Sequence, residues 1–156
     1  MDPLYGERMS GRRHFAGVVL VDRRGWVLLQ ERDEHPRIDP EHWGLVGGHV
    51  DEGEDVETAA YRELAEETDV VAAPGSLRWF GEFEVDHTEA YGTWDLMATY
   101  AAATDLTDDD IVCHEGRRIV FVDPVEATAL PLTKGASVIL PAFLLSDLYR
   151  DLVAMP

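Results

Sequence analysis

Residues 47–70, GGHVDEGEDVETAAYRELAEETDV, decide how the rest of the chain is interpreted. A pair of glycines opens the stretch, and a segment of good helix-forming residues closes it. Each helical residue advances by about 100°, so Glu63, Glu66 and Glu67 fall within roughly 100° of one helix face. Like charges this close repel one another, whereas Mg²⁺ is held by a few carboxylates together with substrate phosphates. The stretch therefore predicts a loop followed by a metal-binding helix.

The stretch resembles the motif of the Nudix (MutT-like) hydrolase family, in which a glycine, several glutamates and an Arg-Glu pair recur at fixed spacings. The matching positions are Gly48, Glu54, Arg62, Glu63, Leu64, Glu66, Glu67 and Val70. Asp69 departs from the motif, because it stands where the family has glycine. Asp tolerates the left-handed backbone conformation better than most residues but less well than Gly, so the resemblance is weakest at the end of the helix.

The resemblance implies roles for these residues. Glu63, Glu66 and Glu67 match the metal-binding glutamates of the family, and Gly47 matches a residue whose backbone carbonyl often completes the coordination of the ion. The implied ion is Mg²⁺, with Mn²⁺ as the alternative. Arg62 lies four residues before Glu66 and next to Glu63, so it can orient a metal-binding carboxylate. A surface ion pair is the alternative interpretation of this arginine.

The substrate that the resemblance implies is a nucleoside diphosphate linked to another group. Water attacks one phosphorus and the bridging oxygen leaves, and cations are needed because the phosphate oxygens already carry negative charge. Members of the family often use a further carboxylate from a late loop as metal ligand or general base. Glu115 is the candidate here, with an ordinary loop glutamate as the alternative. The helix glutamates are rival candidates for the base.

Three residues outside the motif are candidate substrate-binding residues. Arg32 resembles an arginine that contacts phosphate in related enzymes, and a solvated surface arginine is the alternative. Trp43 and Tyr91 could stack on a base, although aromatic residues at strand positions more often belong to the core.

The sequence downstream of the motif bears on the choice of substrate. It does not resemble the short motifs that distinguish the family's enzymes for ADP-ribose or for diadenosine polyphosphates. An ordinary or oxidised nucleoside triphosphate is therefore the first choice, and a nucleotide sugar is the second. A non-catalytic nucleotide-sensing module is the alternative to hydrolysis.

Charge and composition narrow the expected partners. A net charge of −18 with a single lysine argues against a nucleic-acid backbone or an anionic membrane surface, and leaves a small nucleotide. The first residues lack an apolar signal-peptide core, and no apolar run approaches the roughly 18 residues of a membrane span. Cys113 stands alone, which excludes an internal disulfide and fits a reducing cytoplasm. The resemblance is compatible with a homodimer, which is common in the family.

Residue patterns also predict the order of the elements. Residues 1–12 are expected to form a flexible N-terminal arm, followed by a single domain over residues 13–156. A helix is predicted from near Glu54, and a final helix is predicted over residues 135–153, in which Pro141 favours a kink or a late start. The predicted strands cover residues 15–21, 26–31, 43–46, 77–86, 93–103 and 117–122.

Strands before and after one central helix, with a second helix at the end, indicate an α/β fold. The expected architecture is an α/β/α sandwich around a mixed β-sheet. The Nudix resemblance implies the same layout.

Overall fold

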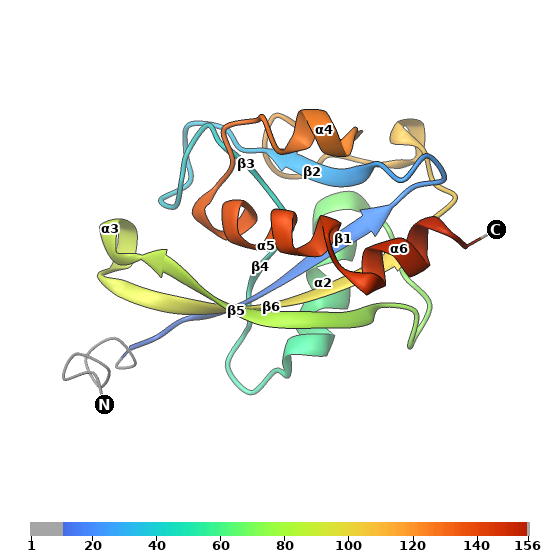
Figure 1. Cartoon of the computed structure of the whole chain (residues 1–156). Coiled ribbons are helices and arrows are strands. Elements are labelled where there is room, and N and C mark those ends of the chain that lie inside the picture. The colour runs from blue at the N-terminus through green and yellow to red at the C-terminus, as the bar shows by residue number, and fades with distance from the viewer. Residues whose placement is uncertain (1–10, 156) are drawn as a thin grey trace.

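A seven-stranded sheet forms the centre of the computed structural model, which describes residues 11–155 (Figure 1). Strand β1 (His14–Val21) lies in the middle and pairs in parallel with β6 (Thr93–Ala103). The other edge of β6 pairs antiparallel with β5 (Arg78–His87). Because one pairing is parallel and the others are antiparallel, the sheet is mixed, as the sequence predicted.

The second edge of β1 is shared by two strands. Strand β4 (Val46–His49) pairs with the first half of β1, and β2 (Val27–Glu31) pairs with its end at Val21. Strand β7 (Arg118–Val122) pairs with β2 along one edge, and β3 (Trp43–Gly44) pairs with Gln30 and Glu31 from the opposite edge. This change of partner along β1 puts the glycine pair of β4 in the middle of the molecule.

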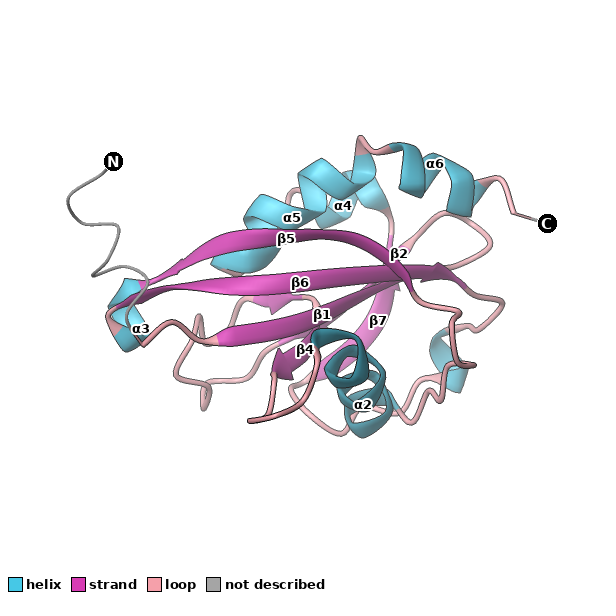
Figure 2. Ribbon diagram, turned by 90° about the horizontal axis from the view of Figure 1, so that it is seen from below, coloured by secondary structure: helices cyan, strands magenta, loops and turns pink. Residues whose placement is uncertain are grey.

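Helices cover both faces of the sheet (Figure 2). Helix α2 (Val56–Thr68) packs on β1 and β4, and α5 (Lys134–Leu144) packs on β5 across the sheet. The apolar stripe of α2 is fully buried at Ala59, Ala60 and Leu64, and the two alanines let the helix approach the strands closely. This arrangement confirms the predicted α/β/α sandwich.

The apolar run of β1 follows from its position between these two layers. Val18 and Leu20 face the core beneath α2, whereas Val19 and Val21 face the core beneath α5. A strand covered on both faces needs apolar residues at every position, so it shows a continuous run without alternation.

The prediction of one continuous C-terminal helix was wrong. Two helices, α5 and α6 (Asp147–Val153), replace the single helix expected over residues 135–153. Pro141 lies inside α5, and the break comes later, at Leu145 and Ser146. The Ser146 side chain accepts a hydrogen bond from the Tyr149 N–H, so it starts a new helix as an N-cap.

Three short elements complete the structure. They are α3 (Thr88–Tyr91), the 3₁₀ turn η1 (Asp108–Asp110) and α4 (Pro124–Ala127). Strand β5 runs one residue further than predicted and includes His87, while α3 occupies the connection to β6.

Residues 1–10 of the arm predicted over residues 1–12 lie outside the described residues. Arg12, which is described, pairs with Glu84 of β5 at 3.0 Å. Within residues 11–155 no helix is long and apolar enough to cross a membrane.

Candidate active site

The glycine pair of β4 is required by close contacts on both sides. Gly47 has φ +155°, and a Cβ atom there would lie 2.1 Å from the carbonyl oxygen of Ala16. A Cβ atom on Gly48 would lie 2.7 Å from Oε1 of Glu63. Only glycine therefore lets β4 pass between β1 and the carboxylates of α2.

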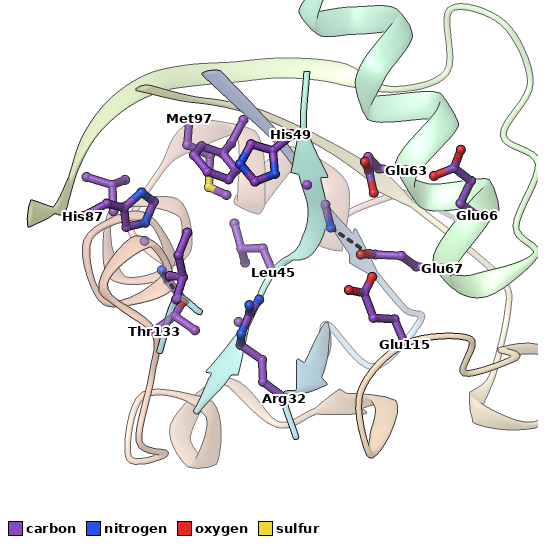
Figure 3. Close-up of a pocket in the computed structure, with 18 of the residues that line it drawn as sticks. Arg32, Leu45, His49, Glu63, Glu66, Glu67, His87, Met97, Glu115 and Thr133 are labelled. Carbon is purple, nitrogen blue, oxygen red and sulfur yellow. Dashed lines mark hydrogen bonds between the residues drawn. The ribbon is translucent and has the colours of Figure 1, made fainter. Parts of the chain in front are cut away.

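Helix α2 presents its three glutamates towards β4 (Figure 3). The Glu67 residue is 4% exposed, and its Oε2 accepts a hydrogen bond from the Gly47 N–H at 2.9 Å. The Glu63 side chain is 12% exposed, and that of Glu66 is 59% exposed. The three carboxylates thus range from buried to solvent-facing along one side of the helix.

A loop from late in the chain brings Glu115 to the same place (Figure 3). The backbone N–H groups of Val112 and His114 donate to the carbonyls of Thr68 and Glu67 at 3.2 and 3.0 Å. These carbonyls belong to the last turn of α2, where no helical partner is available. The end of the helix therefore binds the loop and brings Glu115 to the same cavity as Glu67.

Asp69 stands where the motif has glycine, and it adopts the backbone conformation that this position requires. It caps α2 in the left-handed conformation at φ +63°, and its N–H donates to the Ala65 carbonyl at 3.0 Å. Its Oδ1 lies 2.8 Å from Nε2 of His114. Aspartate thus adopts the backbone conformation that favours glycine, and it adds a side-chain contact to the loop that glycine lacks.

Arg62 joins the helix to the loop before it. Its guanidinium donates to both oxygens of Glu54 at 2.8 Å, to Glu63 at 3.0 Å and to Glu66 at 3.1 Å. It also donates to the His49 carbonyl at 3.0 Å. The hydrogen bonds with Arg62 lower the pKa of Glu54 to about 2, and those with Glu54 raise the pKa of the guanidinium. The sequence suggested this orienting arrangement, and the structure brings these groups together.

The carboxylates destabilise one another when no cation is bound. Burial, followed by the hydrogen bond and the negative charge of Glu115, raises the pKa of Glu67 to about 10. Burial also raises the pKa of Glu63, although Arg62 opposes this effect. A buried cluster of carboxylate oxygens with surplus negative charge fits a hard divalent cation, which removes the protons and the repulsion together.

The carboxylates line one end of a cavity of about 340 Å³. Small-molecule sites have volumes of about 300–1,000 Å³, so this volume is near the lower limit. Arg32 also lines the cavity, and its Nε is buried without a hydrogen-bond partner among the described residues. The structure therefore brings six of the predicted site residues to one cavity, and these are Gly47, Glu63, Glu66, Glu67, Glu115 and Arg32.

The rest of the cavity is lined by apolar side chains and two histidines, of which His87 lies on the far side from the glutamates in Figure 3 and His49 lies between. His87 is 6% exposed, and its Nδ1 lies 2.7 Å from Oδ2 of the fully buried Asp95. Burial and the positive charge of Arg13 lower the pKa of His49. The lining residues of this end are Phe15, Leu45, His49, Val85, His87 and Met97.

Sequence reasoning missed His87 and Asp95, because it assigned His87 to a turn. Val85 and His87 are two residues apart on β5, so they share a face of the sheet. In the register, Val85 stands opposite Asp95 and His87 opposite Thr93. The sequence signal that could have found His87 is the alternation of faces along β5, continued by one residue beyond the predicted end of the strand.

Two predicted substrate contacts lie elsewhere. Trp43 is 6% exposed and packs in the core beneath α5, with the Arg118 guanidinium 5.0 Å from its ring centre. The stacking role expected for Trp43 was therefore wrong, because the ring is enclosed by core side chains. Tyr91 is not among the residues that line the cavity, and Arg13 covers its ring at 3.7 Å. A substrate contact by Tyr91 stays a prediction.

Comparison with known families gives a match over most of the chain. The model of the NUDIX domain family matches residues 11–143. This range contains all the strands, helix α2 and the loop with Glu115.

Curated relatives are similar over a shorter stretch. One is the RNA pyrophosphohydrolase of Caulobacter vibrioides (strain NA1000 / CB15N), with 52% identity over 56 residues. The match covers 36% of this chain and 31% of that protein. The chain thus spans about a third of the length of this relative.

Solved structures share the fold. A MutT protein from Methanosarcina mazei Go1 has a TM-score of 0.71 at 19% identity, with 85% of this chain and 92% of that chain covered. The NUDIX domain of Shewanella oneidensis NrtR, which was crystallised with ADP ribose, has a TM-score of 0.69 at 22% identity. Here 90% of each chain is covered.

Proposed function

The chain belongs to the NUDIX domain family, and from this premise we propose that it hydrolyses the pyrophosphate linkage of a nucleoside triphosphate. The observation that carries the proposal is the convergence of three α2 glutamates and Glu115 on one end of a cavity of about 340 Å³. Such a group of carboxylates is unfavourable by itself and becomes favourable around a divalent cation.

The residues that would hold Mg²⁺, or Mn²⁺ in its place, are Glu63, Glu66, Glu67 and the backbone carbonyl of Gly47. When bound, the ion would neutralise phosphate oxygens and lower the pKa of a coordinated water. The Gly47 N–H holds Glu67 in place through its 2.9 Å hydrogen bond. Arg62 fixes Glu63 and Glu66 relative to the loop.

Glu115 is the proposed proton acceptor for the attacking water, because it reaches the cluster from a different segment of the chain. A base on its own loop can be placed on the water without disturbing the ligands on the helix. Glu67 is the rival base, and burial and Glu115 raise its pKa to about 10, so without a cation it already holds a proton. As a ligand of the cation Glu67 would be deprotonated with its oxygens engaged, and Glu115 would accept the proton of the attacking water.

Arg32 is the proposed phosphate-binding residue. Its Nε is buried and has no partner within residues 11–155, and the residue lines the same cavity as the glutamates. A guanidinium binds phosphate oxygens with two parallel hydrogen bonds, so it would stabilise the charge on the leaving phosphate.

Removal of pyrophosphate from the 5′ end of RNA is a second candidate, because the curated relatives of the chain are RNA pyrophosphohydrolases. The reacting group is the same 5′-triphosphate. The net charge of −18 argues against it, since binding of an RNA backbone depends on neutralising phosphates with basic residues. A nucleotide sugar is the third substrate to test.

The test is a product-release screen of the purified chain with Mg²⁺, with Mn²⁺ and with EDTA. The substrates are nucleoside triphosphates, 8-oxo-dGTP, nucleotide sugars and an oligoribonucleotide with a 5′-triphosphate. We expect the highest kcat/KM for a free nucleoside triphosphate, and we expect EDTA to abolish its turnover. A higher kcat/KM for the oligoribonucleotide would transfer the proposal to RNA 5′ ends.

Glu63→Gln is the matching variant, and Glu57→Gln is its control. Glu57 is exposed on the same helix and does not line the cavity. We expect Glu63→Gln to lose turnover while it still folds and binds nucleotide, and Glu57→Gln to behave as the parent chain does. If the parent chain is folded and binds nucleotides but turns over none of these substrates, the enzyme proposal is overturned in favour of a nucleotide-sensing module.

A further inference from the structure

We propose that His87, held by Asp95 at the end of the cavity away from the glutamates, selects nucleotides whose base carries an exocyclic amino group. The inference rests on the proposed function, because the phosphates must occupy the glutamate end for the base to reach His87. It names the substrate class as 6-aminopurine or 4-aminopyrimidine nucleotides, in preference to their 6-oxo and 4-oxo counterparts.

His87 lies at the end of the cavity away from the glutamates. The residue is 6% exposed and lines the cavity, and Figure 3 shows it on the far side from the four labelled glutamates. Its Nδ1 is engaged by Asp95, which leaves Nε2 as the ring nitrogen that can bind a ligand in the cavity.

Asp95 determines the tautomer of the His87 ring. Asp95 is fully buried, and its Oδ1 accepts from the Arg13 N–H at 2.9 Å and from the Thr93 hydroxyl at 2.7 Å. Its Oδ2 accepts from Nδ1 of His87 at 2.7 Å, so the ring proton resides on Nδ1. In a neutral imidazole the other nitrogen then has a lone pair. Nε2 of the neutral His87 ring is therefore a hydrogen-bond acceptor.

Apolar side chains surround the His87 ring. Phe15 packs edge-on against His87 with ring centres 5.2 Å apart, and Val85 and Met97 add apolar surface to the cavity. A hydrogen bond in such surroundings discriminates strongly, because a mismatched polar atom is buried without a partner. An N–H donor on the base would satisfy Nε2, whereas a carbonyl oxygen in its place would face a lone pair.

Exchange of the amino group for oxygen replaces the donor at that position by an acceptor and also places a proton on the adjacent ring nitrogen. ATP and ITP differ at position 6 of the base, and CTP and UTP differ in the same way at position 4. In the parent chain we expect kcat/KM to be at least about tenfold higher for the amino member of whichever pair is the better substrate. The difference should appear in KM, because the reacting phosphates lie at the other end of the cavity.

Asp95→Asn gives the sharpest test, because it should reverse the tautomer. The Arg13 N–H and the Thr93 hydroxyl both donate to the Oδ1 position, so the amide oxygen is expected to stay there. The amide NH₂ would then point at His87 and donate to Nδ1, which moves the ring proton to Nε2. The preference should invert, with the oxo nucleotide becoming the better substrate of the pair.

His87→Leu removes the acceptor and should bring the two kcat/KM values of each pair to within about twofold of each other. His35→Leu is the matched control, since its imidazole is exposed and lies outside this cavity. Nitrogen-15 NMR of the ring gives a readout that does not depend on turnover. We expect protonation on Nδ1 alone in the parent chain and on Nε2 alone in Asp95→Asn.

The outcomes separate this inference from the proposed function. Turnover of nucleotides without an ATP/ITP or CTP/UTP preference, or a preference that persists in His87→Leu, overturns the inference and leaves the hydrolase proposal standing. Protonation of both ring nitrogens at the assay pH also overturns it. If no nucleotide is turned over by any variant, the hydrolase proposal fails, and the NMR tautomers still decide the geometry of the His87–Asp95 pair.

Discussion

The two ends of the cavity are built from different kinds of structure. The glutamate end combines a glycine pair, one helix and a late loop, and polar contacts to Arg62 and Asp69 hold it together. The His87 end is formed mainly by side chains of β1, β5 and β6, which the register of the sheet places side by side. The first end presents carboxylates to the cavity, whereas the second presents mainly apolar side chains and two imidazoles. Chemistry at one end and recognition at the other can therefore be altered separately.

Glu67→Gln should give the largest effect and act on the chemistry alone. The variant removes one charged ligand from the buried cluster, so we expect kcat to fall by about 10²–10⁴-fold. KM for the nucleotide should stay within a few fold, because the His87 end is unchanged. Steady-state kinetics with Glu57→Gln as control would check this, and a large rise in KM with normal kcat would contradict the division between the two ends.

Gly48→Ala should show how closely the glutamate end is fitted. The added methyl group would lie 2.7 Å from Oε1 of Glu63, so that carboxylate must move. We expect the affinity for Mn²⁺, measured by calorimetry, to fall by about 10–100-fold, as for other disturbances of the groups around a metal site. Glu57→Gln, on the exposed side of α2 and outside the cavity, is the control. Unchanged affinity in Gly48→Ala would mean that Glu63 is not a ligand.

Met97→Ala tests the opposite end. Met97 lines the cavity on β6 and belongs to the partly buried side chains packed on the core. Its loss removes apolar surface from the base-binding region, so we expect KM to rise about tenfold with little change in kcat. A fall in kcat with constant KM would show that the two ends are not independent. Thermal unfolding of the variant separates a local effect from loss of the fold.

Asp69→Gly restores the residue that the family motif carries and removes the contact with His114. Glycine adopts the left-handed conformation without strain, so the cap of α2 should survive. The loop with Glu115 would lose its 2.8 Å side-chain contact, and we expect kcat to fall by about 2–5-fold, the effect of a partly exposed ion pair. His114→Ala should give the same loss, and the double variant no further loss.

The smallest effect is on stability and depends on pH. The folded-state pKa of Glu67 is raised to about 10, so the folded chain holds this proton more tightly than the unfolded chain does. The stabilisation from this group is complete below its unfolded pKa of about 4.3, and it is lost as pH rises towards 10. Without metal, Glu67→Gln should therefore unfold at a higher temperature than the parent chain at pH 8, by a few degrees.

Metal should reverse this order. Addition of Mg²⁺ is expected to raise the Tm of the parent chain and to have less effect on Glu67→Gln, because only the parent retains the full set of carboxylates. Equal Tm values for the two chains in EDTA at pH 8 would contradict the raised pKa. Scanning calorimetry at pH 5 and pH 8 checks both expectations.

Much of the glutamate end could be predicted from the sequence because it is encoded locally. Helical periodicity alone aligns Glu63, Glu66 and Glu67, and one turn of helix brings Arg62 to Glu66. The contact of Glu115 with this cluster was expected from the family resemblance. Its physical cause, the binding of the loop by the exposed carbonyls of α2 and by Asp69, appears only in the folded chain.

Trp43 and His87 show where local patterns fail. An aromatic residue in a strand can face a cavity or the core, and the side is decided by what packs against the sheet. Trp43 faces the core beneath α5, so its stacking role was wrong. His87 gained its role from Asp95, which lies eight residues away on the neighbouring strand and reaches it only through the register of β5 and β6.

The sequence by itself determined the family motif, the order of the strands, the sandwich architecture and the carboxylate face of α2. These depend on periodicity and on conformational preferences within a few residues, which act before any tertiary contact forms. The tertiary structure alone decided the raised pKa of Glu67, the core position of Trp43 and the orientation of His87. Each of these results from burial or from a partner distant in sequence, and neither exists until the sheet and its helices pack together.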